Sequence, residues 1–459
     1  MELTYGLKDR PSKGKLLLLA LQQLLAILAG TITLPLIVGN GLSQSAALFG
    51  ASVGTLVYLA ITKFRSPVFL GSSFTFLGSM IAAFTGAASV AIGYVGIVLG
   101  ACFAGLVYVI LSIVVKHVGS NWIQKVMPPV IIGPVVALIG LTLAPNAIVS
   151  ATRGNVIING TTCANPYICL AVAFITLITT IVVSIHFKGF IKLIPFVIAI
   201  LIGYIVASLL TLIGNVSHID ALKIVDYSAF NNIKWIPDFA FLHLGKGFKD
   251  LIDSGEFGSY IILIVALYVP VSFACFAEHI ADHKNLSMLI NQDLLKDPGL
   301  NRTLMGDGVG SIVGALFGGC PNTTYGESIS CIAYSKNASI ITIIVGSFLG
   351  IAVSFFGPLM AFLSTIPSCI VGGLSVALYG YIASSGLRML KNVELNDTKN
   401  IFVVSTIFIV GIGGLSVKLQ HIEFSPVVCA LVFGILANLL VKTPTHNKKE
   451  KHPDTEDKK

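Results

Sequence analysis

Long apolar runs alternate with short polar or Gly/Pro-rich breaks along almost the whole chain. A helix needs about 20 apolar residues to cross the hydrocarbon core of a bilayer, and most of these runs approach that length. We place fourteen apolar segments, seven of them at 16–38, 45–62, 74–84, 91–115, 126–148, 167–185 and 193–213, and seven more at 259–279, 304–317, 327–333, 340–356, 369–383, 401–412 and 426–441. The pattern predicts an all-α polytopic membrane protein.

Three of these segments, at 74–84, 304–317 and 327–333, are too short or too polar for ordinary lipid-facing helices. Extended backbone at membrane depth leaves N–H and C=O groups without partners, which is tolerated only where protein or a watery cavity satisfies them. We therefore expect the breaks before 74 and 327 to lie inside the protein. Each break should direct the N-terminus of a half-helix toward the middle of the membrane.

Two pairs of stretches indicate an internal repeat. MPPVIIGPVVALIG (127–140) and PSCIVGGLSVALYG (367–380) stand 240 positions apart and agree at five positions. LGSSFTF (70–76) and CPNTTYG (320–326) are both rich in small and hydroxyl residues, and both open a short apolar run. Seven segments in each half is an odd number, so the halves must have opposite orientation. Inverted repeats with interrupted segments at matching positions indicate a transport site near the membrane midplane.

These features predict the organisation of the chain. We expect a cytoplasmic tail at 1–15, a first inverted repeat at 16–213, an external connector at 214–258, a second repeat at 259–441 and a charged cytoplasmic tail at 442–459. The connector mixes both signs of charge with aromatic residues, which is typical of a segment that lies along the membrane interface.

Composition and charge agree with this class. Hydrophobic residues make up 55% of the chain and charged residues only 11%, whereas a soluble domain has about 25% charged residues. The eight cysteines are scattered without a C-x-x-C pair and are interpreted as core residues. With a cytoplasmic N-terminus, 23 of the 29 Lys and Arg residues face the cytoplasm. The net charge therefore indicates orientation in the cell membrane, with both termini cytoplasmic, rather than a nucleic-acid partner. No cleavable signal peptide is evident.

Few ionisable residues fall in or near the apolar segments: Glu278, His279, Asp282, His283, Asp307 and Glu327. A buried carboxylate costs several kcal/mol unless it is paired or protonated, so each is a candidate functional group. Counting places Glu278 near the cytoplasmic end of its segment, with His279 and Asp282 as the partners that hold it. Asp307 is expected to have a helix-end or packing role.

HIADH (279–283) resembles the H-x-x-E-H zinc motif, but the motif requires Glu where Asp282 stands, and no third ligand is evident. We therefore expect no metal site. A membrane metalloenzyme is the weakest of the possible functions, and the chain is not expected to be an enzyme.

A family resemblance rests on five motifs: AEHIADH (277–283), DLLKDPGL (293–300), CPNTTYGES (320–328), LGSSFTF (70–76) and LQQLLAILAGT (21–31). Together they resemble the nucleobase/ascorbate transporter family, and within it most closely the bacterial uracil permeases. The resemblance implies two inverted seven-segment repeats with short extended stretches in segments 3 and 10. It further implies a core domain of segments 1–4 and 8–11 and a gate domain of segments 5–7 and 12–14. The implied function is proton-coupled uptake of uracil, with the proton gradient and no cofactor.

The resemblance also implies six substrate-binding residues: Glu278, Glu327, Phe74, Tyr325, Gly326 and Gly30. The two carboxylates match groups that contact the base, and Phe74 matches an aromatic residue that packs against it. Candidates for proton coupling are Glu278, Glu327, His279 and Asp282. Two positions depart from the uracil permease pattern, because Gln23 stands where histidine is frequent and Ser328 where asparagine is common.

The chemistry of the two carboxyl groups suits such a function. A carboxyl matches the N–H/C=O edge of uracil with two hydrogen bonds when protonated and accepts from N–H when ionised. Two carboxylates beside one neutral base repel each other, so we expect one proton to be retained. Proton and base would then favour each other's binding, which symport requires.

Two other transport functions remain open. Purine and xanthine permeases of the same superfamily usually carry Gln where Glu327 stands. An anion exchanger or channel on the related fold would be expected to carry cationic groups at the breaks, and neither break contains Lys or Arg. Analogy with proteins of this fold also suggests a homodimer formed through the gate domain.

Overall fold

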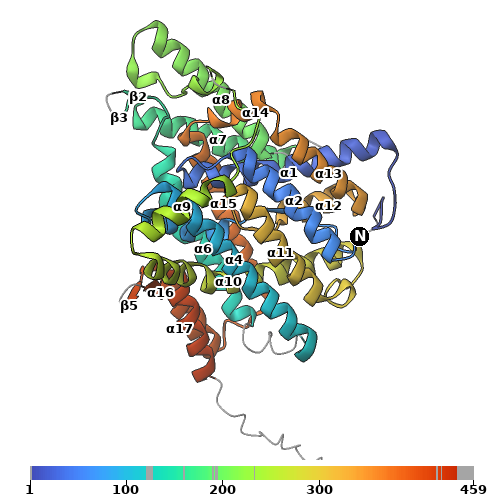
Figure 1. The fold of residues 1–459 in the computed structure, drawn as a ribbon. Helices are drawn as coiled ribbons and strands as arrows, with labels where there is room; N and C mark the ends of the chain where they lie inside the picture. Colours follow the sequence, from blue (N-terminus) through green and yellow to red (C-terminus); the bar gives the residue numbers. More distant parts are fainter. Residues whose placement is uncertain are drawn as a thin grey trace, which may run out of the picture.

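The computed structural model describes residues 3–119, 128–158, 161–188, 191, 195–231, 233–419, 422–424 and 426–441. Helices dominate this part of the chain (Figure 1). Eight of its helices are long and apolar enough to cross a membrane, or nine if the bent pair α13 (Ile340–Ser354) and α14 (Gly357–Ser364) counts as one span. The prediction of a mostly helical protein with many apolar segments is confirmed. The predicted C-terminal tail at 442–459 lies outside the described residues.

The order of elements is similar in the two halves of the chain. The first half contains α1 (Lys13–Val38), α2 (Gln44–Ile61), β1 (Leu70–Ser72), η1 (Phe74–Phe76), α3 (Leu77–Thr85), α4 (Val90–Val118), α6 (Pro129–Ala151), α7 (Pro166–His186) and α8 (Pro195–Val216). The second half contains α10 (Phe257–Ile290), α11 (Leu300–Gly318), β4 (Asn322–Thr324), α12 (Gly326–Ser335), α13, α14, α15 (Ser368–Met389), α16 (Thr398–Ile412) and α17 (Pro426–Val441). Each of the fourteen predicted apolar segments overlaps one of these helices.

Three features of the helices differ from expectation or were not predicted. Helix α10 runs to Ile290, so Glu278 lies well inside a 34-residue helix rather than near its end. The polar residues after His279 continue the helix because helix formation does not require an apolar side chain at every turn. Helix α14 and the amphipathic helix α9 (Phe241–Asp253) were not predicted as separate elements.

The two broken segments meet in the interior as a pair of antiparallel strands. β1 pairs with β4 in the register Leu70↔Thr324, Gly71↔Thr323 and Ser72↔Asn322, and all six residues are buried. One further bond on each side extends the ladder: Ser73 N–H donates to Pro321 O at 2.8 Å, and Tyr325 N–H donates to Phe69 O at 3.1 Å. The predicted extended stretches are therefore present, and each supplies hydrogen-bond partners to the other's backbone.

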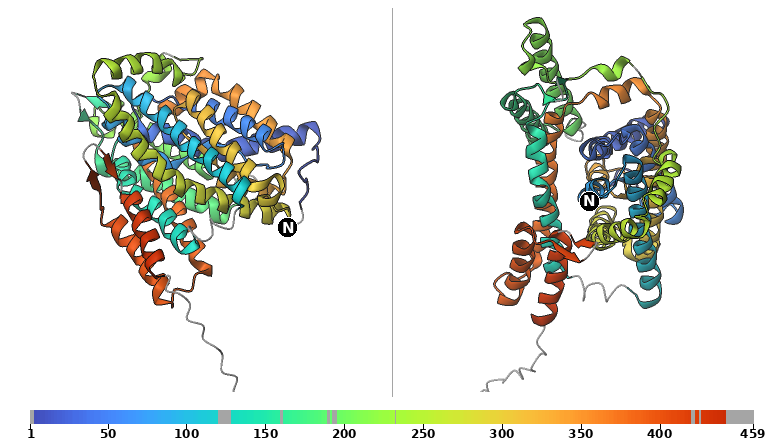
Figure 2. Two further views of the ribbon diagram at one scale, coloured as in Figure 1. Left: turned by 60° about the horizontal axis from the view of Figure 1, so that its bottom comes forward. Right: turned by 60° about the vertical axis from the view of Figure 1, so that its left-hand side comes forward.

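The helices pack in two groups, which stand beside each other in the right-hand view of Figure 2. In the first group, α2 and α4 pack against α11, α13 packs against α1 and α2, and α10 packs against α4. In the second group, α6 packs against α15, α16 and α17, and α15 also contacts α7 and α8. The predicted core and gate domains stay a prediction, because they are defined by how such groups move.

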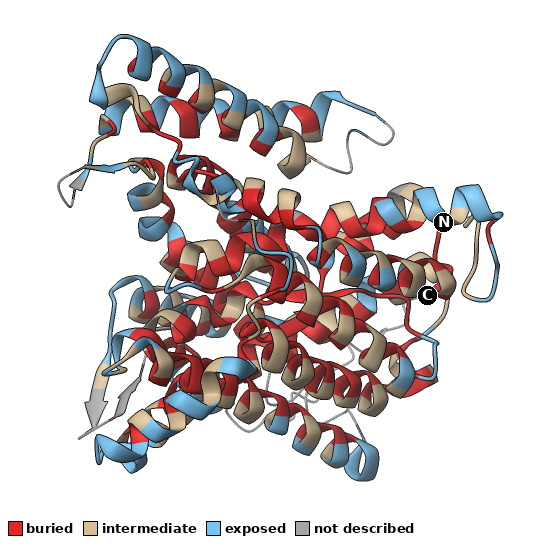
Figure 3. Cartoon of the chain, turned by 45° about the horizontal axis from the view of Figure 1, so that its top comes forward, coloured by how far each residue is buried: buried red, intermediate tan, exposed pale blue. Residues whose placement is uncertain are grey.

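Buried residues concentrate in the middle of the molecule, whereas exposed residues lie on its outer faces (Figure 3). Many of the exposed side chains on α7 and α8 are nevertheless apolar, among them Phe174, Ile178, Ile205, Leu209 and Leu212. A soluble protein rarely exposes so many apolar side chains on one surface. These helices therefore suit contact with lipid.

Helices α2 and α11 approach each other through glycine. A Cβ built on Gly54 would lie 2.5 Å from the carbonyl oxygen of Gly310, and one built on Gly318 would lie 2.7 Å from Ala47 Cα. Small residues let two backbones come this close, as they do between helices in membranes generally. The β4 strand leaves directly from the end of α11, so this contact also positions the strand pair.

We expect Gly54→Ala to lower the melting temperature of the purified protein, because the added methyl group overlaps backbone that cannot move aside. An overpacked site of this kind costs about 1–3 kcal/mol. The matched control is Gly258→Ala on α10, where a Cβ would meet nothing within 4 Å. Equal melting temperatures for the two variants would contradict the proposed close contact.

Candidate functional site

Helix α10 carries two carboxyl groups that reach the two broken segments. Glu278 Oε2 accepts a hydrogen bond of 3.0 Å from Thr75 Oγ1, in η1 directly after β1. Asp282 Oδ2 accepts one of 2.9 Å from Thr324 Oγ1 at the end of β4. Glu278 and Asp282 are four residues apart and therefore lie on the same face of α10. This face accepts one hydroxyl hydrogen bond from each half of the chain.

The second break opens directly into α12, which carries Glu327 in its first turn. The residue before this helix, Tyr325, makes no side-chain capping bond to it, and the first N–H groups of any helix lack intrahelical acceptors. Gly326 is exposed, and a Cβ built there would meet nothing within 4 Å. Glu327 and Glu278 are both half-buried. The N-terminus of α12 at Gly326 therefore borders open space, and both glutamates keep part of their surface accessible.

Four carboxyl groups lie near the two breaks, of which Glu278, Asp282 and Glu327 are half-buried and Asp307 is buried. Glu278 and Asp282 lie within electrostatic range of each other, of Glu327 and of Asp307. Within the described part of the chain, no Lys or Arg forms an ion pair with any of the four. Several ionised carboxylates in such surroundings repel each other and lose hydration, so the free energy of the cluster falls when some of them hold a proton.

Tyr325 connects α1 to the strand pair. Its ring is 5% exposed and lies over two glycines. A Cβ on Gly71 would lie 2.5 Å from Cε2 of the ring, and a Cβ on Gly30 would overlap the tyrosine hydroxyl. The hydroxyl donates to Ser72 O at 3.3 Å. Glycine at positions 30 and 71 therefore makes room for this ring, which brings Gly30 and Tyr325 together beside the breaks.

Phe74 lies where the two helix groups meet. It is 9% exposed, and its ring meets the ring of Tyr379 on α15 edge to face, with centroids 6.3 Å apart. Tyr379 was not singled out from the sequence, although it lies in the repeat at 367–380. A contact between distant helices of different groups leaves no local signal in the chain.

The expectation that His279 holds Glu278 is wrong, and Asp307 lies inside a helix rather than at a helix end. His279 does not hold Glu278: its Nδ1 lies 2.6 Å from Asp307 Oδ2 and its Nε2 lies 3.1 Å from Thr303 Oγ1. Asp307 is 1% exposed in the interior of α11 and also accepts from Thr323 Oγ1 at 3.4 Å. The pair forms a buried polar layer between α10, α11 and β4. Spacing along one helix could not reveal it, because Asp307 comes from a neighbouring helix.

His283 belongs to a similar layer. Its Nε2 lies 2.8 Å from the hydroxyl of Tyr58 on α2, and its Nδ1 lies 2.9 Å from the carbonyl oxygen of His279. Among the described residues, no group of three or more His, Cys, Asp and Glu side chains is arranged to hold a metal ion. The two histidines are engaged with protein groups instead.

The two departures from the uracil permease pattern contact each other. Ser328 Oγ donates to Gln23 Oε1 at 3.1 Å, and Gln23 Nε2 donates to Ser328 O at 3.4 Å. Phe69 N–H donates to the same Ser328 hydroxyl at 3.1 Å. This bonded set joins α1, the β1 segment and α12, and it lies one residue from Glu327. Gln23 and Ser328 stand 305 positions apart, so the sequence could not show the pairing.

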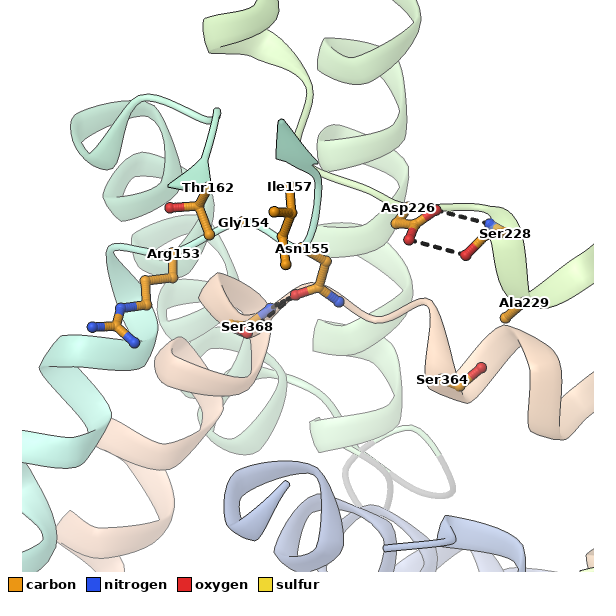
Figure 4. Close-up of a pocket in the computed structure, with 10 residues that line it drawn as sticks. All are labelled: Arg153, Gly154, Asn155, Ile157, Thr162, Asp226, Ser228, Ala229, Ser364 and Ser368. Atoms are coloured by element: carbon orange, nitrogen blue, oxygen red, sulfur yellow. Dashed lines mark hydrogen bonds between the residues drawn. The ribbon is translucent and has the colours of Figure 1, made fainter. Parts of the chain in front are cut away.

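A separate pocket of about 380 Å³ lies between the end of α6, the paired strands β2 (Ile157–Ile158) and β3 (Thr161–Thr162), the connector and the α14–α15 junction (Figure 4). Asn155 Oδ1 accepts from both Ser368 N–H and Ser368 Oγ, and Asp226 accepts from Ser228. None of the predicted site residues lines this pocket. The candidate site is therefore the carboxyl cluster at the two breaks.

Comparison with known proteins identifies relatives over nearly the whole chain. A family model described as "Permease family" matches residues 14–419. A uracil permease of Bacillus caldolyticus is 36% identical over 441 residues, which are 95% of this chain and 94% of the relative. Uracil permeases of Bacillus subtilis (strain 168) and Escherichia coli (strain K12) are 34% and 30% identical, over 98% and 95% of this chain and 97% and 94% of their own.

Solved structures of the same fold are more distant in sequence. The transmembrane domain of the cyanobacterium bicarbonate transporter BicA matches with a TM-score of 0.61 at 15% identity, over 95% of this chain and all of that domain. SLC26A9 matches with a TM-score of 0.62 at 13% identity, over 93% of this chain and 64% of its own. At these identities the likeness concerns the fold alone.

The contact between Gln23 and Ser328 predicts coupled effects of mutation. We expect Gln23→Ala and Ser328→Ala each to lower thermal stability, and the double variant to lose about 1 kcal/mol less than the sum of the two, since either single change already breaks their bond. A cycle of Gln22→Ala with Ser328→Ala is the control and should be additive. Additive losses in the Gln23 cycle would show that this bond contributes nothing.

Proposed function

Because the chain belongs to the nucleobase/ascorbate transporter family of membrane permeases, we propose that it is a secondary active transporter that takes up uracil together with protons across the cell membrane. The relatives that are 30–36% identical over most of the chain bear the name uracil permease. The structural observation that carries the proposal is the cluster of carboxyl groups at the two breaks, beside the open start of α12.

The proposed binding mode follows from the chemistry of the cluster. Glu278 and Glu327 bind the N–H and C=O groups of the base, and N–H groups at the start of α12 donate to a carbonyl oxygen of the ring. Phe74 packs against the planar ring, and Gly326 leaves space for it. Tyr325 and Gly30 form the wall on the side of α1.

Proton coupling follows from repulsion within the cluster. A proton held by Glu278 or Glu327 removes one negative charge and supplies a donor for a carbonyl oxygen of uracil. Binding of the base and of the proton then stabilise each other, which couples their movement. His279 follows Glu278 directly and Asp282 lies about one helical turn further on, and both are further candidates to hold or pass the proton. No cofactor other than the proton gradient is proposed.

Transport itself requires the site to face each side of the membrane in turn. We propose fourteen segments in two inverted repeats, with the group of α1–α4 and α10–α13 as core domain and the group of α6–α8 and α15–α17 as gate domain. The Phe74–Tyr379 contact crosses between them, so movement of one domain relative to the other would open or close the site. Both termini are placed in the cytoplasm, and dimerisation through the gate domain is an expectation by analogy.

The alternatives are less well supported. The structural neighbours BicA and SLC26A9 are described as a bicarbonate transporter and an anion transporter, but a site with four carboxyl groups disfavours an anionic substrate. A purine or xanthine permease of the same superfamily remains the alternative within the family, and Glu327 argues against it.

Uptake of labelled uracil into proteoliposomes distinguishes these functions. With an inward proton gradient we expect accumulation above the external concentration, which a protonophore abolishes because the driving force is lost. Unlabelled uracil should compete, and unlabelled xanthine should not. Uracil uptake that does not change with the proton gradient would contradict proton coupling. Competition by xanthine would favour a purine or xanthine permease.

Substitution of the glutamates tests the site. Glu278→Gln and Glu327→Gln should each reduce gradient-driven uracil accumulation to the level of empty liposomes, since an amide keeps the shape of a carboxyl but cannot exchange the proton. Glu256→Gln, which changes an exposed glutamate before α10, is the control. All three variants should elute as the native protein does. Normal accumulation in either site variant would remove that residue from the mechanism.

A further inference from the structure

Helix α9 in the connector lies across the beginning of α4. Gly247 sits so close to α4 that a Cβ would overlap the carbonyl oxygen of Ala91. Ser89 Oγ donates to Asp250 Oδ2 at 3.2 Å, and the ring of His243 stacks on Tyr94 with centroids 4.3 Å apart. α4 is a 29-residue apolar helix that begins at Val90. Since α9 contacts its first turns, α9 lies at the level where α4 enters the bilayer.

The surface of the connector at this level combines apolar and basic side chains. Leu242 and Ile252 are 60% and 64% exposed on α9, and Trp235 and Ile236 are 56% and 72% exposed just before it. We call the exposed apolar and basic residues of these two stretches the connector patch: Lys234, Trp235, Ile236, Phe241, Leu242, Lys246, Lys249 and Ile252.

Aromatic contacts hold the two stretches together. Phe239 stacks on Phe241 at 5.6 Å and meets Phe49 of α2 at 5.0 Å. Phe49 contacts Phe355, and the adjacent Phe356 contacts Trp235 at 6.2 Å. One set of aromatic contacts therefore packs both stretches of the connector patch against helix α2 and the residues directly after α13.

The charges of the connector patch are unusual for this chain. In the predicted orientation only six basic residues face outward, and three of them are Lys234, Lys246 and Lys249. Of the nearby acidic groups, Asp238 is bonded to His243 at 3.0 Å and Asp250 to Ser89, both on the side facing α4. Asp253 and Glu256 are exposed beyond Ile252, at the end of the helix. The middle of the patch is left with a positive charge beside apolar side chains.

We propose that the connector patch binds anionic phospholipids in the leaflet on this side of the membrane. Apolar side chains at an interface bury among the acyl chains, Trp prefers the headgroup level, and lysines bury their alkyl stems while the ammonium groups reach lipid phosphates. The connector leads directly into α10 at Phe257. Bound lipid therefore holds the helix that carries Glu278 at a fixed depth in the bilayer.

Trp235 gives a local readout, because the sequence has only one other tryptophan, Trp122. In a Trp122→Phe background, the fluorescence of Trp235 is measured in bilayers that contain brominated phosphatidylglycerol or brominated phosphatidylcholine as the quencher. We expect about a fivefold or greater preference for phosphatidylglycerol at low salt, since each lysine near an anionic surface contributes on the order of that factor. The preference should fall as salt is raised.

The variant Lys234→Gln/Lys246→Gln/Lys249→Gln should bring the preference close to one while Trp235 remains quenched by both lipids. The control Lys8→Gln/Arg10→Gln/Lys116→Gln removes the same charge elsewhere and should keep the preference. Absence of quenching by either lipid would place the patch outside the bilayer and overturn the proposal. Equal quenching by the two lipids in the unmodified patch would also overturn the proposal. So would a preference for phosphatidylglycerol that is unchanged in the triple lysine variant. These readouts do not depend on transport, so they are separate from the test of the proposed function.

Discussion

Hydrogen bonding between β1 and β4 is the constraint on which the rest of the structure depends. A chain that breaks its helix in the membrane exposes backbone groups that lipid cannot satisfy, and each unsatisfied group costs several kcal/mol. Here the two breaks satisfy each other across the register Leu70↔Thr324 to Ser72↔Asn322. Glycines at 54 and 310 let α2 and α11 approach closely beside this pair. The polar start of a short helix can therefore lie in the interior of this protein. In a bundle of unbroken helices, apolar side chains would fill the same place.

The carboxyl groups follow from that arrangement. Once two breaks lie side by side, a single neighbouring helix can reach both, and α10 does so through Glu278 and Asp282. Glu327 enters from the half-helix that the second break begins. Negative charge concentrated in this way is unfavourable without a proton or a hydrogen-bonding ligand. The same repulsion that makes the cluster costly would link the binding of a neutral base to the binding of a proton.

Much of the fold could be predicted because its signals are local. Apolar runs mark the helices, and the small hydroxyl-rich stretches at 70–76 and 320–326 mark the breaks. Motif resemblance indicated Glu278, Glu327 and Phe74, and the structure places these residues around the breaks. The remaining contacts depend on which helices become neighbours. His279 bonds to Asp307 of α11, Gln23 to Ser328 of α12, and Phe74 meets Tyr379 of α15. No spacing along the chain encodes such pairs.

In the proposed mechanism, one carboxyl cluster binds the base and a proton together. Calorimetric titration of the purified protein with uracil, repeated in buffers of different ionisation enthalpy, measures the number of protons taken up on binding. We expect net proton uptake when uracil binds at neutral pH, and loss of that uptake in Glu278→Gln or Glu327→Gln. Uracil binding without any proton uptake at neutral pH would contradict this mechanism.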